Sequence, residues 1–171
     1  MNVLVGFEES GTVREAFRLF GHNAWSCDLL ESSIPSEFHI VGDIYEALHF
    51  MNWDIIILHP MCTALTVAGN STYGLNRDGT PKEKHHLRVE AIKYTEKLWN
   101  DAVSVCGMVC LENPVGVLTT KSNLPKPQYV HPWQFGHKEQ KKTALFLHGL
   151  PNLEGTFDVR VWMNLIRSSG S

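Results

Sequence analysis

The chain has 171 residues, a length that suits one domain with a sizeable core. Hydrophobic residues make up 43% of the chain and charged residues 19%, and this composition excludes a disordered protein. The formal net charge of −3, with the histidines counted as neutral, excludes the strongly basic surface typical of many nucleic-acid-binding domains.

The first segments of the sequence predict a strand, a helix and a second strand. Residues 2–6 are apolar and β-branched, which favours a strand. A loop over residues 7–11 follows, and residues 12–20 have the apolar spacing of a helix. Residues 22–28 predict the second strand, which ends on Asp28. Two strands around a helix, with a carboxylate after the second, are typical of a nucleoside-binding unit.

Two more strands are expected before the middle of the chain. Residues 38–43 predict a short strand ending on Asp43, and residues 44–50 predict a short helix. The four apolar residues from Ile55 to Leu58 then predict a buried strand of a parallel sheet. Pro60 ends this strand, because proline cannot donate a hydrogen bond to a sheet.

The second half predicts one long helix and two further strands. The expected segments are a loop over residues 68–81, a helix over 82–102, a buried strand over 105–111, an irregular stretch over 115–129, a strand over 143–148 and a short tail over 150–171. Alternating strands and helices imply a doubly wound α/β fold, with a mostly parallel sheet and helices on both faces. We expect a single domain over residues 1–171.

The cysteines do not predict a metal site. Cys27, Cys62, Cys106 and Cys110 form no Cys-x-x-Cys pair and have no zinc-finger spacing with histidine. No signal peptide or long apolar span is recognisable, so we expect a cytoplasmic protein with reduced thiols and no membrane partner.

Several chemically active residues follow the predicted strands directly. The loop of residues 7–11, Asp28, Cys62 and Glu112 each come after the carboxyl end of a strand. In a doubly wound sheet these ends share one edge, where such folds bind their ligands. The sequence therefore predicts that a thiol, a Glu112-Asn113 pair and a nucleoside-type site lie together.

The acidic first loop favours one class of cofactor. Glu8 and Glu9 would repel a pyrophosphate, which needs glycines and main-chain amides around it. S-adenosylmethionine carries a sulfonium and an ammonium and no phosphate, so it is compatible with this loop. Asp28 would then bind the ribose hydroxyls and Asp43 the adenine amino group. The alternatives are a solvated turn for Glu8 and Glu9, and helix caps for Asp28 and Asp43.

Three segments resemble motifs of the DNA cytosine-5 methyltransferase family, in the compact form found among phage proteins. Pro60-Met-Cys-Thr-Ala-Leu-Thr66 resembles the family's Pro-Pro-Cys-Gln-x-Phe-Ser nucleophile loop, and Glu112-Asn-Pro114 resembles its Glu-Asn-Val motif. Gln140-Lys-Lys-Thr-Ala-Leu-Phe-Leu-His-Gly149 resembles its Gln-x-Arg-x-Arg-Val-Phe-Ile-x-Gly segment. The matches follow the family's order over roughly residues 2–149. They imply an S-adenosylmethionine-dependent methyltransferase fold, with a cofactor-binding half over residues 1–58 and a catalytic half over 59–149.

The resemblance implies methyl transfer from S-adenosylmethionine to C5 of cytosine in DNA or a related nucleotide. Cys62 would add to C6 of the base and Glu112 would stabilise charge at N3. Asn113 would hold the loops of the site, and Lys142 would lie near O2 of the base. A base in a duplex would have to be flipped out of the stack. The expected cofactor contacts are Phe7, Glu8, Glu9, Ser10, Gly11, Asp28, Asp43 and Pro60.

The sequence departs from the family pattern at named positions. Met61 replaces a proline, His59 replaces the small residue before it, and Ala144 stands where a second arginine is usual. No target-recognition domain or terminal helix is recognisable over residues 150–171. The substrate would therefore be single-stranded DNA, duplex DNA or a cytosine nucleotide, with a specificity partner or a homo-oligomer as further options.

Two other readings stay open for the whole chain. One is a catalytically weak module that sequesters S-adenosylmethionine or a nucleotide, such as a phage accessory protein. The other is a different nucleotide-modifying enzyme on the same fold. For Cys62 itself, the alternative to the nucleophile is a plain loop thiol.

Basic and aromatic residues before the last strand offer a contact for nucleic acid. Lys138, Lys141 and Lys142 would line a path for phosphates, or are simply solvated. Trp133 and Phe135 would stack on a base, or belong to the core.

Overall fold

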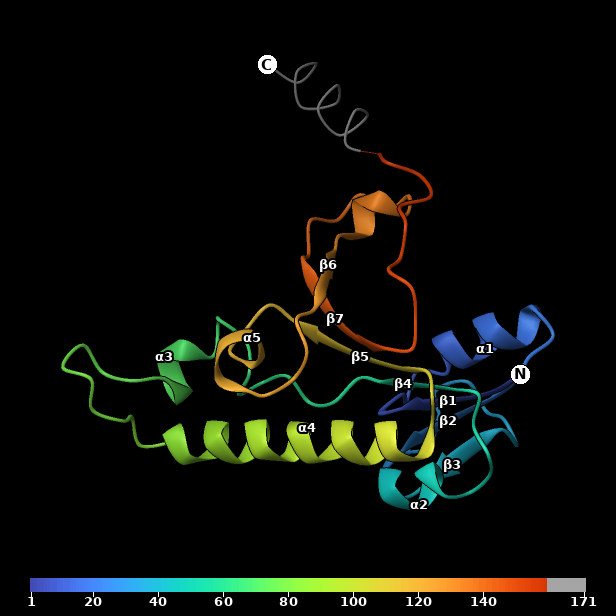
Figure 1. Cartoon of the computed structure of the whole chain (residues 1–171), viewed down its shortest axis with the longest axis horizontal. Helices are drawn as coiled ribbons and strands as arrows, with labels where there is room; N and C mark the ends of the chain where they lie inside the picture. The colour runs from blue at the N-terminus through green and yellow to red at the C-terminus, as the bar shows by residue number, and fades with distance from the viewer. Residues whose placement is uncertain (160–171) are drawn as a thin grey trace.

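A seven-stranded sheet forms the centre of the chain, of which the computed structural model describes residues 1–159. The strands lie in the order β3-β2-β1-β4-β5-β7-β6. Their bounds are β1 (Asn2–Gly6), β2 (Asn23–Asp28), β3 (His39–Val41), β4 (Ile55–Leu58), β5 (Val109–Pro114), β6 (Gln128–Val130) and β7 (Thr143–His148). The strands β1 to β5 pair in parallel, and β7 runs antiparallel to β5 and β6. The mostly parallel α/β sheet predicted from the sequence is confirmed (Figure 1).

Helices cover both faces of the sheet, as predicted. They are α1 (Thr12–Leu19), α2 (Ile44–Leu48), α3 (Asn70–Tyr73), α4 (His85–Val105), α5 (Leu118–Lys121) and the 3-10 helix η1 (Pro132–Gln134). Val13 and Phe17 of α1 pack on Val3 and Val5 of β1. Leu4, between these two, points to the opposite face and joins the core formed with α2 and α4. Figure 1 shows α1 on one side of the sheet and α2 and α4 on the other.

The strand β5 lies later in the chain than predicted. It covers Val109–Pro114 rather than residues 105–111, because α4 continues to Val105. The ladder with β7 extends it further, with Glu112 opposite Leu145 and Asn113 opposite Ala144. Glu112 and Asn113 are thus held in the sheet itself rather than in a loop after it.

Short elements occupy two segments that were predicted to be irregular. Helix α3 lies within the predicted loop over residues 68–81, and α5 with the start of β6 lies within residues 115–129. These elements of three or four residues are too short to show a hydrophobic period. The predicted tail is described only as far as residue 159, and its remainder lies outside the described residues.

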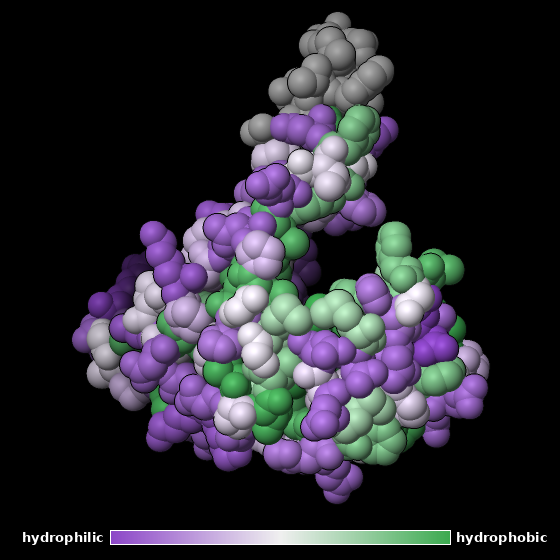
Figure 2. Space-filling model, turned by 45° about the vertical axis from the view of Figure 1, so that its right-hand side comes forward, coloured by the Kyte–Doolittle hydropathy of each residue, from purple (hydrophilic) through white to green (hydrophobic). Residues whose placement is uncertain are grey.

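The strands β6 and β7 project from the body together with the segment that joins them. We call residues 128–142 the β6–β7 arm. Figure 2 shows it as a narrow extension above the broad body. The segment after β7 returns along it, where Phe157 forms a bridge with Phe135. Within residues 1–159, no helix is long and apolar enough to cross a membrane.

Candidate active site

Three adjoining cavities lie at the carboxyl ends of β1, β2 and β4. Their volumes are about 620, 350 and 60 Å³. Phe7 and Asp28 line all three, while His59 lines the two larger ones. The shared lining makes them parts of one cleft, which we call the rim cleft. It lies where doubly wound sheets bind their ligands, as the sequence predicts.

The chain turns sharply at Phe7 as it leaves β1. Phe7 has a φ of 61°, the left-handed region that side chains other than glycine rarely adopt. A backbone held in this region costs on the order of 1–3 kcal/mol and is found most often at functional sites. The main-chain amide of Glu8 then bonds to the carbonyl of Cys27 at 3.1 Å, which fixes the turn against β2. This turn places Phe7 in the lining of all three cavities of the rim cleft.

Glu8 caps the first helix. Its side chain is only 5% exposed, and its carboxylate accepts hydrogen bonds from the amides of Val13 and Arg14 at the start of α1. A carboxylate at a helix N-terminus satisfies free amides and interacts well with the helix dipole. The solvated turn considered for Glu8 is therefore wrong. Glu8 still lines the 350 Å³ cavity beside Glu9 and Ser10, and Glu9 accepts a hydrogen bond from Ser33 Oγ.

Gly11 joins the first loop to α1 as the N-cap of the helix. Its φ of 70° is left-handed, and a Cβ there would lie 2.6 Å from the Arg14 guanidinium. Arg14 is fully buried, with hydrogen bonds to Ser26 Oγ and the carbonyl of Ile34. The first loop, residues 7–11, is thus held in place by Arg14 as well as by Glu8.

Asp28 and Asp43 both act as local caps and both line the smallest cavity. Asp43 Oδ1 accepts from the amide of Tyr45 at 2.8 Å, as the N-cap of α2. Asp28 Oδ1 accepts from the amide of Leu30 at 3.1 Å. The Oδ2 atoms of both residues make no hydrogen bond within the described part of the chain. Each aspartate therefore keeps one oxygen for a ligand, so the cap and ligand roles are compatible.

Tyr94 of α4 closes the rim cleft from the side opposite the sheet. It lines the 620 and 60 Å³ cavities and makes an edge-on contact with Tyr45, at 6.3 Å between ring centroids. Burial, reinforced by Tyr45 and Asp43, raises the pKa of Tyr94 to about 12, so its hydroxyl stays protonated at neutral pH. The sequence predicts only that Tyr94 belongs to the helix over residues 82–102. Its place in the cleft depends on how α4 crosses the sheet, which no local pattern indicates.

His59 and Glu112 form a pair across the ends of β4 and β5. The distance from His59 Nδ1 to Glu112 Oε2 is 3.3 Å, and each side chain is 28% exposed. His59 Nε2 is buried and has no hydrogen-bond partner among residues 1–159. The sequence shows His59 only as a departure from the family pattern, and its contact with Glu112, 53 residues away in the chain, leaves no local signal.

Asn113 connects β5 to the loop that carries Cys62. Its Nδ2 donates to the carbonyl of Pro60 at 3.2 Å, and the residue is 1% exposed. The carbonyl of Cys62 accepts from the amides of Leu65 and Thr66, which closes a tight turn. Cys62 itself is half-buried. The expected role of Asn113 in holding the loops of the site agrees with this hydrogen bond.

Arg88 and Gly116 fix the far end of the same loop. The buried guanidinium of Arg88 on α4 bonds to the carbonyls of Ala64 and Thr66, at 2.7 and 3.2 Å. Gly116 lies so close that an added Cβ would be 1.9 Å from the Leu65 oxygen. A glycine and a buried arginine, each of whose three side-chain nitrogens donates a hydrogen bond, thus hold residues 62–66, which we call the Cys62 loop.

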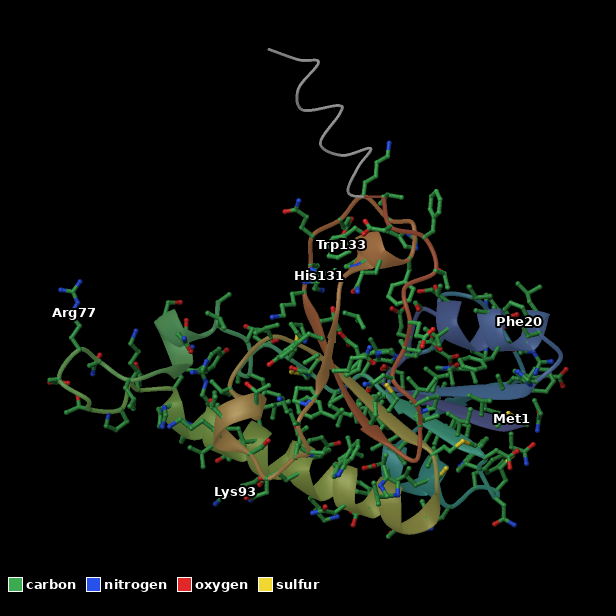
Figure 3. The ribbon with its side chains drawn as sticks, turned by 45° about the horizontal axis from the view of Figure 1, so that its top comes forward. Met1, Phe20, Arg77, Lys93, His131 and Trp133 are labelled. Atoms are coloured by element: carbon green, nitrogen blue, oxygen red, sulfur yellow. The ribbon has the colours of Figure 1, made fainter. Side chains whose placement is uncertain are left out.

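Lys142 lies apart from Glu112. Thr143 pairs with Pro114 at the end of the β5–β7 ladder, so Lys142 is beyond the strand end while Glu112 is opposite Leu145. Lys142 Nζ lies 4.1 Å from the centre of the Tyr129 ring, a cation–π contact on the β6–β7 arm. Farther along the arm His131 and Trp133 stack, with 5.1 Å between ring centroids (Figure 3).

The thiols of two other cysteines, Cys27 and Cys110, have raised pKa values. Burial beside Asp28 and Asp43 raises the pKa of Cys27 to about 11. Burial near Glu112 raises the pKa of Cys110 to about 12. Both thiols stay protonated at neutral pH and are poor nucleophiles. In the described chain, no group of three or more His, Cys, Asp or Glu residues could hold a metal ion.

The comparisons with known proteins show the fold alone. No family model matches the chain. No curated protein matches it either. Among solved structures, the chain is similar to the medium-resolution structure of the bifunctional kinase-methyltransferase WbdD, with a TM-score of 0.52 and 15% identity over 91% of this chain and 36% of that one. A 2.2 Å crystal structure of WbdD matches with a TM-score of 0.50 and 14% identity, over 91% of this chain and 37% of that one.

The likeness defines the class of fold. The chain spans little more than a third of the length of these WbdD chains. Its sheet and helices follow a fold that also occurs within WbdD, which agrees with the α/β architecture expected from the sequence.

Proposed function

We propose that the chain is a methyltransferase that transfers a methyl group from S-adenosylmethionine to C5 of cytosine in DNA or a related nucleotide. The observation that carries the proposal is the link between Cys62 and Glu112. Asn113, next to Glu112, is hydrogen-bonded to Pro60, and Glu112 itself is hydrogen-bonded to His59. His59 and Pro60 lie just before Cys62 in the chain. The thiol in the loop after β4 and the carboxylate on the neighbouring strand β5 are thereby fixed beside the rim cleft.

The residues of the rim cleft fit S-adenosylmethionine. Asp28 and Asp43 each have a free carboxylate oxygen for ribose and adenine hydrogen bonds. Phe7, Leu29 and Tyr94 give apolar surface for the adenine ring. Glu9 and Glu8 place negative charge near the sulfonium and ammonium groups. When bound, the cofactor would supply an electrophilic methyl group.

Cys62 and Glu112 would divide the chemistry on the base. The Cys62 thiolate adds to C6 and turns C5 into an enamine-like carbon that can attack the methyl group. Glu112 uses its Oε1 oxygen as the hydrogen-bonding group at N3, because its Oε2 oxygen is bonded to His59. Asn113 keeps Pro60, just before the Cys62 loop, in place during these steps.

DNA is the favoured form of the substrate because of the β6–β7 arm. Lys138, Lys141 and Lys142 are exposed there, with Glu139 as the acidic residue between them. The arm is thus locally basic on a chain whose net charge is −3. Exposed lysines of this kind bind phosphates.

The direct test offers labelled S-adenosylmethionine with duplex DNA, single-stranded DNA or free cytosine nucleotides. We expect label to enter 5-methylcytosine in at least one DNA substrate, and Cys62→Ser to abolish transfer. Cys110→Ser is the matched control, because Cys110 is also half-buried but its pKa is about 12. Transfer that survives Cys62→Ser would exclude the covalent mechanism. Tight cofactor binding without transfer would indicate the sequestering module instead.

A further inference from the structure

His59 is a residue that the proposed reaction has not yet used. It follows β4 directly and lines the 620 and 350 Å³ cavities together with Phe7 and Asp28. The small residue usual at this position in the cytosine-5 methyltransferase family has no side chain that can exchange a proton. A histidine here adds an ionisable group at the edge of the cleft where the cofactor is proposed to bind.

Glu112 fixes the state of the His59 ring. A carboxylate accepts hydrogen bonds, so the 3.3 Å contact with Oε2 places the hydrogen on Nδ1. Nε2 then carries the lone pair. This atom is buried and has no partner within residues 1–159. A histidine oriented at one nitrogen by a carboxylate, with the other nitrogen free, is the arrangement of a general base.

The neighbours of His59 are mainly acidic. The carboxylates that line its two cavities are Glu8, Glu9, Asp28 and Glu90. Glu112 contacts the ring at Nδ1. Tyr94 faces the same space as a neutral phenol. The described lining of these two cavities holds no lysine or arginine. The ionised side chains around His59 within the described residues of these cavities are therefore all carboxylates.

We propose that His59 Nε2 accepts the C5 proton of the methylated cytosine. The proposal rests on the proposed function. In the preceding step C5 bonds to the methyl carbon as the methyl–sulfur bond breaks, and S-adenosylhomocysteine is released. His59 then takes the C5 proton, the C–H electron pair forms the C5–C6 double bond, and the bond from C6 to Cys62 breaks to return the thiolate. Glu112 stabilises the imidazolium, which passes its proton to water.

The experiment separates proton removal from the steps before it. In DNA that contains 5-fluorocytosine, Cys62 can add to C6 and methyl transfer can occur. The fluorine takes the place of the C5 proton and cannot be removed by a base, so the covalent adduct accumulates. His59→Asn is the informative variant, because its amide nitrogen takes the place of Nδ1 and can still donate to Glu112. His59→Gln, with its nitrogen at the place of Nε2, is the second variant if His59→Asn does not fold.

We expect the wild type and His59→Asn to form the 5-fluorocytosine adduct at rates within about threefold. Turnover on ordinary cytosine DNA should fall at least about 100-fold in the variant, the usual contribution of a general base. The methylated Cys62 adduct should also accumulate on ordinary DNA with the variant. Parallel loss of adduct formation and turnover would show that His59 only positions Glu112, and unchanged turnover would show that it is not the base. A wild type that forms no adduct would instead overturn the proposed function, whatever His59 does.

Discussion

Asn113 of β5 donates a hydrogen bond from Nδ2 to the carbonyl oxygen of Pro60, at 3.2 Å. The two residues are far apart in the sequence, and both are buried. This bond joins the strand that carries Glu112 to the segment that carries Cys62. The relative position of thiol and carboxylate therefore depends on this amide together with the contact between His59 and Glu112.

Asn113→Ala should loosen this connection. The Pro60 oxygen would be left buried without its donor, which costs about 2 kcal/mol. For a domain of this size that loss lowers the Tm by about 4–8 °C. Thermal unfolding followed by circular dichroism measures the shift. Asn100→Ala is the control, because the Asn100 side chain is exposed on α4 and should change stability by less than about 0.5 kcal/mol. Equal Tm values for the two variants would contradict a structural role for the amide of Asn113.

Gly116→Ala should displace the Cys62 loop. The new Cβ would meet the Leu65 oxygen at 1.9 Å, and a backbone atom cannot move aside as a side chain can. Overpacking of this kind costs about 1–3 kcal/mol. Urea unfolding gives the loss of stability, and faster iodoacetamide labelling of Cys62 would report the displaced loop.

Gly107→Ala provides the comparison for that variant. A Cβ at Gly107 meets nothing within 4 Å, and its φ is not left-handed. We expect little change in stability or labelling. If Gly116→Ala behaves like Gly107→Ala, the close approach of Gly116 to Leu65 has no energetic importance.

Local sequence patterns predicted most of the fold. The runs at residues 2–6 and 55–58 are short, apolar and bounded by turn residues, and both form parallel strands at the centre of the sheet. The prediction for β5 was wrong in its bounds, because α4 continues to Val105 and β5 begins only after Gly107. The polar residues Glu112 and Asn113 belong to the strand because β7 pairs with them, and a partner across the sheet leaves no signal in the local sequence.

The site was predictable in its location but not in its contacts. Asp28, Asp43 and the loop after β1 could be placed at one edge from strand order alone. The roles of His59 and Tyr94 depend on contacts with Glu112 and Tyr45, each distant in the sequence. Glu8 was expected to face a cofactor or solvent, whereas its main contacts are the amides of α1. A carboxylate shortly before a helix indicates a cap, and that signal was present in the sequence.

Thiol reactivity should single out Cys62. Cys27 and Cys106 are buried, and the pKa values of Cys27 and Cys110 are raised to about 11 and 12. Because only the thiolate reacts, these two should resist labelling until the pH approaches those values. Iodoacetamide at pH 8 followed by mass spectrometry should find Cys62 modified first. Rapid modification of Cys110, which is also half-buried, would contradict the effect of its burial near Glu112.

The β6–β7 arm should determine the salt dependence of DNA binding. We expect Lys138, Lys141 and Lys142 each to contact a phosphate in single-stranded DNA, so their triple replacement by glutamine should reduce the slope of log Kobs against log salt by about 2. Fluorescence anisotropy of a labelled oligonucleotide between 50 and 200 mM salt measures this slope. The control replaces Lys84, Lys93 and Lys121, which are exposed around α4 and α5. Figure 3 shows Lys93 on α4, away from the arm. Because both triple variants remove the same charge, equal effects would mean that DNA responds to net charge alone and not to the arm.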